Sequence, residues 1–246
     1  MDNKGELTTQ QIVGLIVLIV SFSVILLLIF RLDLGETTNK EICHNSVILK
    51  SRSSVGGEID CRTNYVCISG GGDCQGINPT AEVEIDLGGT KEEIKNRTMK
   101  AIADEMVECW WMFGEGKVNY GGVLDKYKER TLWNNYHCAV CSIVKFGDDM
   151  EIDKITYKEF YEYLLETKKD KTQTYLDYLY DAPNMTYVEA KIARTELDLV
   201  GGVISTKEKY AIVTGMKQGY YINPYFVKSN EITNQTECKV FDITKA

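Results

Sequence analysis

The sequence predicts an α+β fold: an N-terminal transmembrane helix, then a disulfide-rich extracytoplasmic domain with a mostly antiparallel sheet and two or three helices. Three observations predict this class. A charge-free apolar run lies near the N-terminus, all eight cysteines follow it, and the later elements are expected in the order strand, helix, strand, helices, strands. This order lacks the regular alternation of a parallel α/β fold. The predicted parts are a leader or cytoplasmic segment (1–11), the transmembrane helix (12–30), a stalk (31–42) and a cysteine-rich domain (43–246).

Composition narrows the class of protein. The 246 residues include 28 lysines and arginines against 36 aspartates and glutamates, which gives a formal net charge of −8. This acidic balance disfavours nucleic-acid binding, because the phosphate backbone attracts basic surfaces. Hydrophobic residues make up 44 % of the chain, so the bulk is expected to fold around a substantial core.

The run from Ile12 to Phe30 carries no charge and predicts a membrane-spanning helix. At about 1.5 Å per residue it covers roughly 28 Å, close to the ~30 Å hydrocarbon core of a bilayer. Ser21 and Ser23 interrupt it, but a helix can satisfy such hydroxyls on its own carbonyls. A cleavable secretory signal is the alternative, with an apolar region of only about 7–15 residues that ends at a small-residue site. This run ends at RLDL (31–34), which offers no such site, so we expect an uncleaved anchor.

Two sets of sequence features predict opposite orientations of the anchor in the membrane. Only Lys4 precedes the helix whereas several basic residues follow it, and by the positive-inside rule this places the large domain in the cytoplasm. The cysteines and three Asn-x-Ser/Thr sequons favour the opposite side, since disulfides and N-linked glycans belong to exported domains. Giving the cysteines more weight, we expect an extracytoplasmic domain. The following basic residues are Arg31, Lys40, Lys50 and Arg52, and the candidate glycosylation residues are Asn96, Asn184 and Asn234.

Directly before the apolar run, the chain carries Lys4, Gly5 and Glu6 and then a short polar stretch, LTTQQ. This arrangement resembles the leader of archaeal type IV pilin-like proteins. In that family a basic residue and a glycine precede the scissile bond, and the apolar helix stays on the mature chain as membrane anchor and filament core. The resemblance implies a mature chain that begins at Glu6. The fifth mature position, commonly glutamate in the family, is Gln10 here, and an ordinary N-terminal anchor is the alternative.

Within the large domain, strands are predicted where apolar and polar residues alternate or where a short apolar run lies between turn signals. Helices are predicted where a capping box precedes an apolar stripe at helical spacing, as after Thr90 and Thr156. A polar stalk and a short apolar run (46–49) are expected before the first strand. The predicted strands are 58–68, 81–87, 136–146, 210–214, 220–227 and 238–243, and the predicted helices are 91–113, 156–166 and 172–180.

An even number of cysteines in an exported domain predicts four disulfides, whose pairing the spacing leaves open. The alternative is a thiol-redox function for Cys138 and Cys141, which have the Cys-x-x-Cys spacing of redox centres. We disfavour it because a β-branched run follows them and predicts a strand, on which residues three apart face opposite sides. The disulfide candidates are Cys43, Cys61, Cys67, Cys74, Cys109, Cys138, Cys141 and Cys238.

Other candidate sites fail on their residue pattern. His44 and His137 each neighbour a cysteine, but nothing in the sequence brings these segments together into a zinc site. The glycines at 70–72 lack the Gly-Lys-Ser/Thr ending of a phosphate loop. The acidic stretch at 148–153 has apolar residues at calcium-ligand positions. Two histidines leave little scope for a Ser-His-Asp triad. No metal, cofactor or catalytic residue is therefore predicted.

All 15 tyrosines follow the anchor, with clusters near 157–163 and 220–226. Such clusters suit contact surfaces or sugar binding, and packing is the plainer interpretation. The sequence thus predicts a non-catalytic, single-pass cell-surface glycoprotein with a structural or binding role, and the resemblance implies a pilin-like filament subunit. The expected partners are the lipid membrane, further copies of the chain through Ile12–Phe30, and other surface proteins or glycans, but not nucleic acid.

Overall fold

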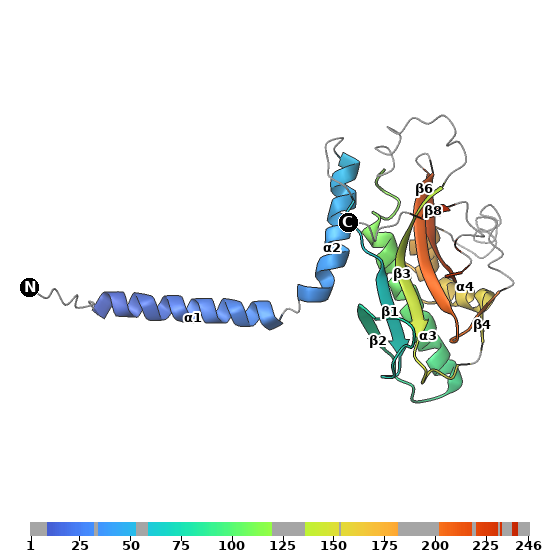
Figure 1. Cartoon of the computed structure of the whole chain (residues 1–246), viewed down its shortest axis with the longest axis horizontal. Helices are drawn as coiled ribbons and strands as arrows, with labels where there is room; N and C mark the ends of the chain where they lie inside the picture. Colours follow the sequence, from blue (N-terminus) through green and yellow to red (C-terminus); the bar gives the residue numbers. More distant parts are fainter. Residues whose placement is uncertain are drawn as a thin grey trace, which may run out of the picture. The chain divides into compact units, whose positions relative to one another are not determined.

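A computed structural model describes residues 9–31, 34–52, 59–119, 136–152, 154–181, 202–217, 220–230, 232 and 238–240 (Figure 1). The chain forms two units, Met1–Asn39 and Lys40–Ala246. The first contains the predicted anchor, and the second contains a mixed sheet with helices packed on it, which confirms the α+β class.

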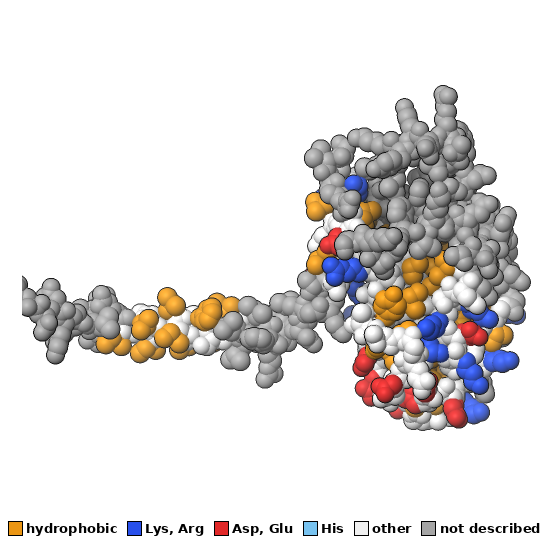
Figure 2. All heavy atoms as spheres, viewed as in Figure 1, with side chains coloured by type: hydrophobic (Ala, Val, Ile, Leu, Met, Phe, Trp, Pro, Cys, Tyr) orange, Lys and Arg blue, Asp and Glu red, His pale blue; other side chains and the backbone are white. Residues whose placement is uncertain are grey.

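Helix α1 (Thr9–Arg31) covers the predicted anchor. The side chains described in it are those of residues 12–25, and Figure 2 shows apolar side chains along its visible face. The hydroxyls of Ser21 and Ser23 donate to the carbonyls of Val17 and Ile19, as predicted, at 2.5 and 2.8 Å. Among the helices in the described part of the chain, none combines the length and the apolar character needed to cross a bilayer.

Helix α2 (Leu34–Arg52) occupies the segment for which the sequence predicts a polar stalk and a short apolar run. Its buried stripe is narrow: Cys43 and Val47, four residues apart, are at most 1 % exposed. Such a stripe is too narrow to stand out as helical periodicity in a polar sequence. Lys50 and Arg52 lie in the last turn, where positive charge complements the helix dipole.

The sheet has the strand order β2-β1-β3-β6-β7, and β8 pairs with β3. Its two longest ladders, β3–β6 and β6–β7, are antiparallel, as predicted, whereas β1–β2, β1–β3 and β3–β8 are parallel. A separate antiparallel pair joins β4 to β5. The strands are β1 (Asn64–Ser69), β2 (Ala81–Glu84), β3 (Tyr136–Phe146), β4 (Ile155–Thr156), β5 (Val203–Ile204), β6 (Lys209–Lys217), β7 (Tyr220–Lys228) and β8 (Cys238–Val240).

Three helices pack together in the domain: α3 (Lys91–Met112), α4 (Tyr157–Glu166) and α5 (Tyr175–Tyr180). Figure 1 shows α3 and α4 on one face of the sheet. Both predicted capping boxes are present, because Thr90 and Thr156 accept from the N3 backbone while the N3 glutamates reach back. Helix α5 is capped at its C-terminal end by Asp181, whose φ of 48° is left-handed. The prediction of two or three helices in this domain agrees with these three among the described residues, and α2 is an additional helix.

Aromatic rings fill the core between the helices and the sheet. Tyr210 and Phe226 stack with centroids 4.6 Å apart, while Phe146 packs on Tyr210 and Phe160 on Phe226 at 6.1 and 6.2 Å. All four side chains are at most 1 % exposed. For Phe160 and Phe226, which belong to the predicted aromatic clusters, packing is therefore the correct interpretation, rather than an exposed contact surface.

Candidate functional site

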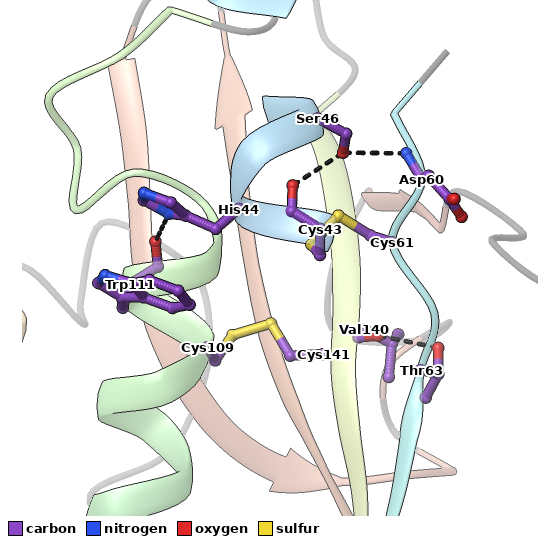
Figure 3. The surroundings of a disulfide bond; sticks show 10 residues. All are labelled: Cys43, His44, Ser46, Asp60, Cys61, Thr63, Cys109, Trp111, Val140 and Cys141. Atoms are coloured by element: carbon purple, nitrogen blue, oxygen red, sulfur yellow. Dashed lines mark hydrogen bonds between the residues drawn. A yellow bond between two sulfur atoms is a disulfide. The ribbon is translucent and has the colours of Figure 1, made fainter. Parts of the chain in front are cut away.

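The candidate site is the region where one disulfide joins α2 to the segment before β1 and another joins α3 to the sheet (Figure 3). Two disulfides lie here: Cys43–Cys61 joins α2 to the segment before β1, and Cys109–Cys141 joins α3 to β3. Their Cα atoms are 4.3 and 5.5 Å apart, and the four cysteines are at most 3 % exposed. All four belong to one hydrophobic core, so these links are inaccessible to solvent.

A β-bulge in β3 explains how two consecutive residues of one strand reach the same helix. The pairing with β6 shifts between Val140 and Ser142, which leaves Cys141 as the extra residue. Cys141 is bonded to Cys109 of α3, and the hydroxyl of Ser142 donates to the Glu105 carboxylate at 3.3 Å. Glu105 and Cys109 are four residues apart and share one face of α3. The bulge therefore aims a disulfide and a hydrogen bond at the same helix face.

The Glu105 carboxylate is the buried charge of this region. The residue is only 6 % exposed, and Lys40 Nζ at the start of the second unit lies 3.6 Å from its Oε1. Lys40 also pairs with Glu108, one turn further along α3. A buried carboxylate requires such a partner, because removing the cation would leave its desolvation uncompensated. Lys40 thus holds α2 to α3 electrostatically beside the covalent link.

His44 adds an aromatic contact between the same two helices. Its ring stacks on Trp111 with centroids 4.1 Å apart and an interplanar angle of 8°, and its Nδ1 lies 2.7 Å from the Trp111 carbonyl oxygen. Both side chains are half-buried. Beside them, the Ser46 hydroxyl donates to the Cys43 carbonyl and accepts from the Asp60 N–H. His44 thus has a packing role; the side chain of His137, its predicted partner in the zinc alternative, lies outside the described residues.

The glycine-rich loop after β1 binds a side-chain carboxylate of the same chain. The N–H groups of Gly70 and Gly72 both donate to Asp149 Oδ2 at 3.0 Å. Cys67–Cys74 closes the loop, and Gly71 within it has a φ of +107° that favours glycine. A Cβ at Gly72 would lie 2.6 Å from the Asp149 carboxyl carbon. The loop is thus a backbone nest filled by a carboxylate, and Asp149 of the acidic stretch at 148–153 supplies this carboxylate.

The hydroxyls of several tyrosines are also satisfied inside the domain. Tyr175 and Tyr178 of α5 donate to Asp104 and Glu115, the first at 2.5 Å. Burial, together with these carboxylates, raises the pKa of both phenols. Partial burial would raise the pKa of Glu115, but hydrogen bonds from Lys117 and Tyr178 lower it below its usual value. These two hydrogen bonds therefore hold α5 against α3 and against the segment that follows α3.

Comparison with protein-family models, with curated proteins and with solved structures finds no match for this chain.

The cysteine chemistry favours the structural interpretation. The redox alternative requires Cys138 and Cys141 to pair with each other near the start of a helix, but Cys141 is bonded to Cys109 and lies on a strand. Three of the four predicted disulfides are present among the described side chains, and those of Cys138 and Cys238 lie outside them. Within the described residues, no cluster of His, Cys, Asp or Glu could hold a metal ion.

Of the three candidate glycosylation residues, only Asn96 is described. It is exposed on α3, whereas Thr98 of the same sequon is 0 % exposed and its hydroxyl donates to the Ile94 carbonyl at 2.9 Å. Folded α3 therefore exposes the asparagine of this sequon and buries its threonine. Asn184, Asn234 and the leader residues Lys4, Gly5 and Glu6 lie outside the described residues.

The sequence did not single out Glu105, Ser142, Trp111 or Asp149. For Glu105 a signal exists, since this carboxylate lies four residues before Cys109 and one before Met106 of the predicted apolar stripe. A charge at the edge of a buried stripe indicates an internal partner. For Asp149 no local signal exists, because the glycines that it binds are about 80 residues away in sequence.

Proposed function

We propose that this protein is a single-pass membrane-anchored domain displayed outside the cell, with a structural or binding role rather than a catalytic one. The exposed apolar surface of α1 carries the proposal. Its large apolar side chains are exposed by 44 % at Ile12 to 67 % at Leu18. Each Å² of such surface costs about 25 cal/mol in water, so a lipid or protein environment is required to cover it. The charge-free run continues to Phe30, a length that suits a bilayer.

The disulfides support the extracytoplasmic side. Three links hold residues 43–61, 67–74 and 109–141, and all are buried. Structural disulfides persist in oxidising compartments and are rare in a reducing cytosol. They outweigh the count of basic residues around the helix, because a large folded domain is translocated with little regard to its charge.

The arrangement of the cross-links supports a structural or binding role. Cys141, the second cysteine of the Cys-x-x-Cys pair, is committed to α3, and the glycine-rich nest is filled by Asp149. Groups that could otherwise act on a substrate are thus used to hold the domain together. Three contacts hold α2 on the domain: the ion pair of Lys40, the disulfide of Cys43 and the ring stack of His44. A force on the anchor would act on these three contacts.

A pilin-like filament subunit is the more specific form of the proposal. It rests on the resemblance of Lys4, Gly5 and Glu6 to a pilin-like leader and on the continuity of α1 from Thr9 to Arg31 as one helix. In such an assembly Ile12–Phe30 would contact both lipid and further copies of the chain. N-terminal sequencing of the native protein tests this form: a start at Glu6 supports it, whereas a start at Met1 or Asp2 leaves a plain anchor.

Carbonate extraction of membranes tests the anchor itself. The full chain is compared with a variant carrying Leu18→Lys and Val20→Lys, and with a control carrying Leu18→Ala and Val20→Ala. Each lysine at the centre of a membrane helix costs about 2.5–3.5 kcal/mol on insertion, whereas alanine costs little. We expect the full chain and the control to stay in the carbonate pellet and to dissolve in detergent, and the lysine variant to be released. Release of the unaltered chain by carbonate would contradict the anchor.

A further inference from the structure

The C-terminal strand lies beside the beginning of the strand that carries Cys141. Strand β8 pairs with β3 in parallel, in the register Tyr136↔Cys238, His137↔Lys239 and Cys138↔Val240. Cys138 and Cys238 are therefore on adjacent strands, two positions apart in register. The other six cysteines are joined to one another. The fold thus brings the two remaining cysteines, about 100 residues apart in sequence, to one place in the sheet.

The register places both cysteines on the same face of the sheet. Residues in register share a face, and so do residues two apart along one strand. A strand spacing of about 4.8 Å and a rise of about 3.3 Å per residue put the two Cα atoms on the order of 8 Å apart. A disulfide needs roughly 4.4–6.8 Å. A slide of β8 by about 2 Å, less than one residue, meets this requirement.

A covalent link would also explain how so short a strand stays in the sheet. Strand β8 has three residues and three register pairs with β3. A parallel ladder of this length is weak, because parallel pairing is less stable per residue than antiparallel pairing. A disulfide that closes a loop of about 100 residues removes more chain entropy than links over 18, 7 or 32 residues.

We propose that Cys138 and Cys238 form a fourth disulfide, which ties the C-terminal strand to β3. The proposal rests on the extracytoplasmic location proposed above, because the step needs an oxidant. Each thiol loses one proton, one sulfur–sulfur bond forms, and two electrons pass to a disulfide-bearing thiol oxidase, which becomes a dithiol. Strand β3 then carries a link to α3 through Cys141 and a link to β8 through Cys138.

Tryptic mapping without reduction tests this pairing in the unaltered full chain. The chain is alkylated at lysis with N-ethylmaleimide, purified in detergent and digested. Cys138 and Cys141 lie on one tryptic peptide (131–145), Cys109 on 101–117 and Cys238 on 229–239. We expect one species that joins all three peptides, measured with and without deglycosylation because Asn234 lies in the last one. Reduction should separate it into three.

Two other results are distinguishable. If peptide 131–145 is joined to 101–117 alone, and Cys138 and Cys238 both carry maleimide, the fourth disulfide is refuted while the export proposal stands. If all eight cysteines carry maleimide, the export proposal fails as well. A Cys238→Ser variant gives a second readout, since we expect its one labelled thiol to be Cys138, whereas Cys67→Ser as a control should expose Cys74. A dimer linked through Cys238 on a non-reducing gel would also overturn the pairing.

Discussion

Removing the Cys109–Cys141 disulfide should destabilise the domain more than removing Cys67–Cys74. The first link closes a sequence separation of 32 residues and the second a separation of 7. The loss of loop entropy in the unfolded chain corresponds to about 3.7 kcal/mol for the longer loop and about 2.4 kcal/mol for the shorter one at 25 °C. The cysteines of both pairs are at most 6 % exposed, but only Cys109 and Cys141 belong to the hydrophobic core. Replacement by alanine therefore costs packing mainly at the Cys109–Cys141 pair, which acts in the same direction as the loop length.

The assay compares thermal unfolding of three proteins in detergent: the full chain, Cys109→Ala with Cys141→Ala, and Cys67→Ala with Cys74→Ala. For a domain of this size about 1 kcal/mol lowers Tm by roughly 2–4 °C. We expect decreases of roughly 7–15 °C for the first pair and roughly 5–10 °C for the second. Circular dichroism at 222 nm follows both transitions. An equal or larger decrease for the Cys67–Cys74 pair would refute the reasoning from loop length.

Two further predictions concern carboxylates. Asp149→Ala should lower the free energy of unfolding by about 1–3 kcal/mol, because the N–H groups of Gly70 and Gly72 lose their acceptor. The control, Asp148→Ala at the neighbouring residue, should change this free energy little. Equal effects of the two variants in urea titrations would contradict the role of Asp149 in the nest. Hydrogen bonds from Lys95 and Thr156 lower the pKa of Glu159 to about 2. The contribution of Glu159 to the free energy of unfolding is thus present above pH 4.5 and lost as the pH falls towards 2. We therefore expect Glu159→Gln to lower this free energy at pH 7 and to lower it less at pH 3. The decrease at pH 7 should be only about 1 kcal/mol, because the side chain is 43 % exposed and solvent screens the ion pair. A difference that does not change with pH would contradict this role.

Local signals in the sequence account for the elements that form through local rules. The capping boxes at Thr90 and Thr156 predict the starts of α3 and α4, because both partners of each box lie within four residues. The mostly apolar run from Tyr136 to Phe146 predicts β3 with the bounds that the structure has. Such elements require no knowledge of distant contacts.

The candidate site depends on distant contacts, which is why the sequence leaves most of it open. The partner of Cys141 depends on the bulge after Val140 and on where α3 crosses the sheet. The helical state of residues 34–52 depends on a docking face of only a few residues, and propensity alone does not settle so narrow a stripe. Strand ends also differ: β1 begins at Asn64 rather than at 58, and β2 ends at Glu84 rather than at 87.

The measurement that tests the central claim most directly is surface labelling of intact cells. A membrane-impermeant amine reagent is applied to cells that produce the full chain, and labelled lysines are located by mass spectrometry before and after lysis. Lys100, Lys158 and Lys117 are suitable reporters, since their side chains are 58, 67 and 75 % exposed. An extracytoplasmic domain predicts labelling of these lysines in intact cells, with a cytoplasmic protein unlabelled. Labelling that occurs only after lysis would place the domain in the cytoplasm and contradict the proposed function.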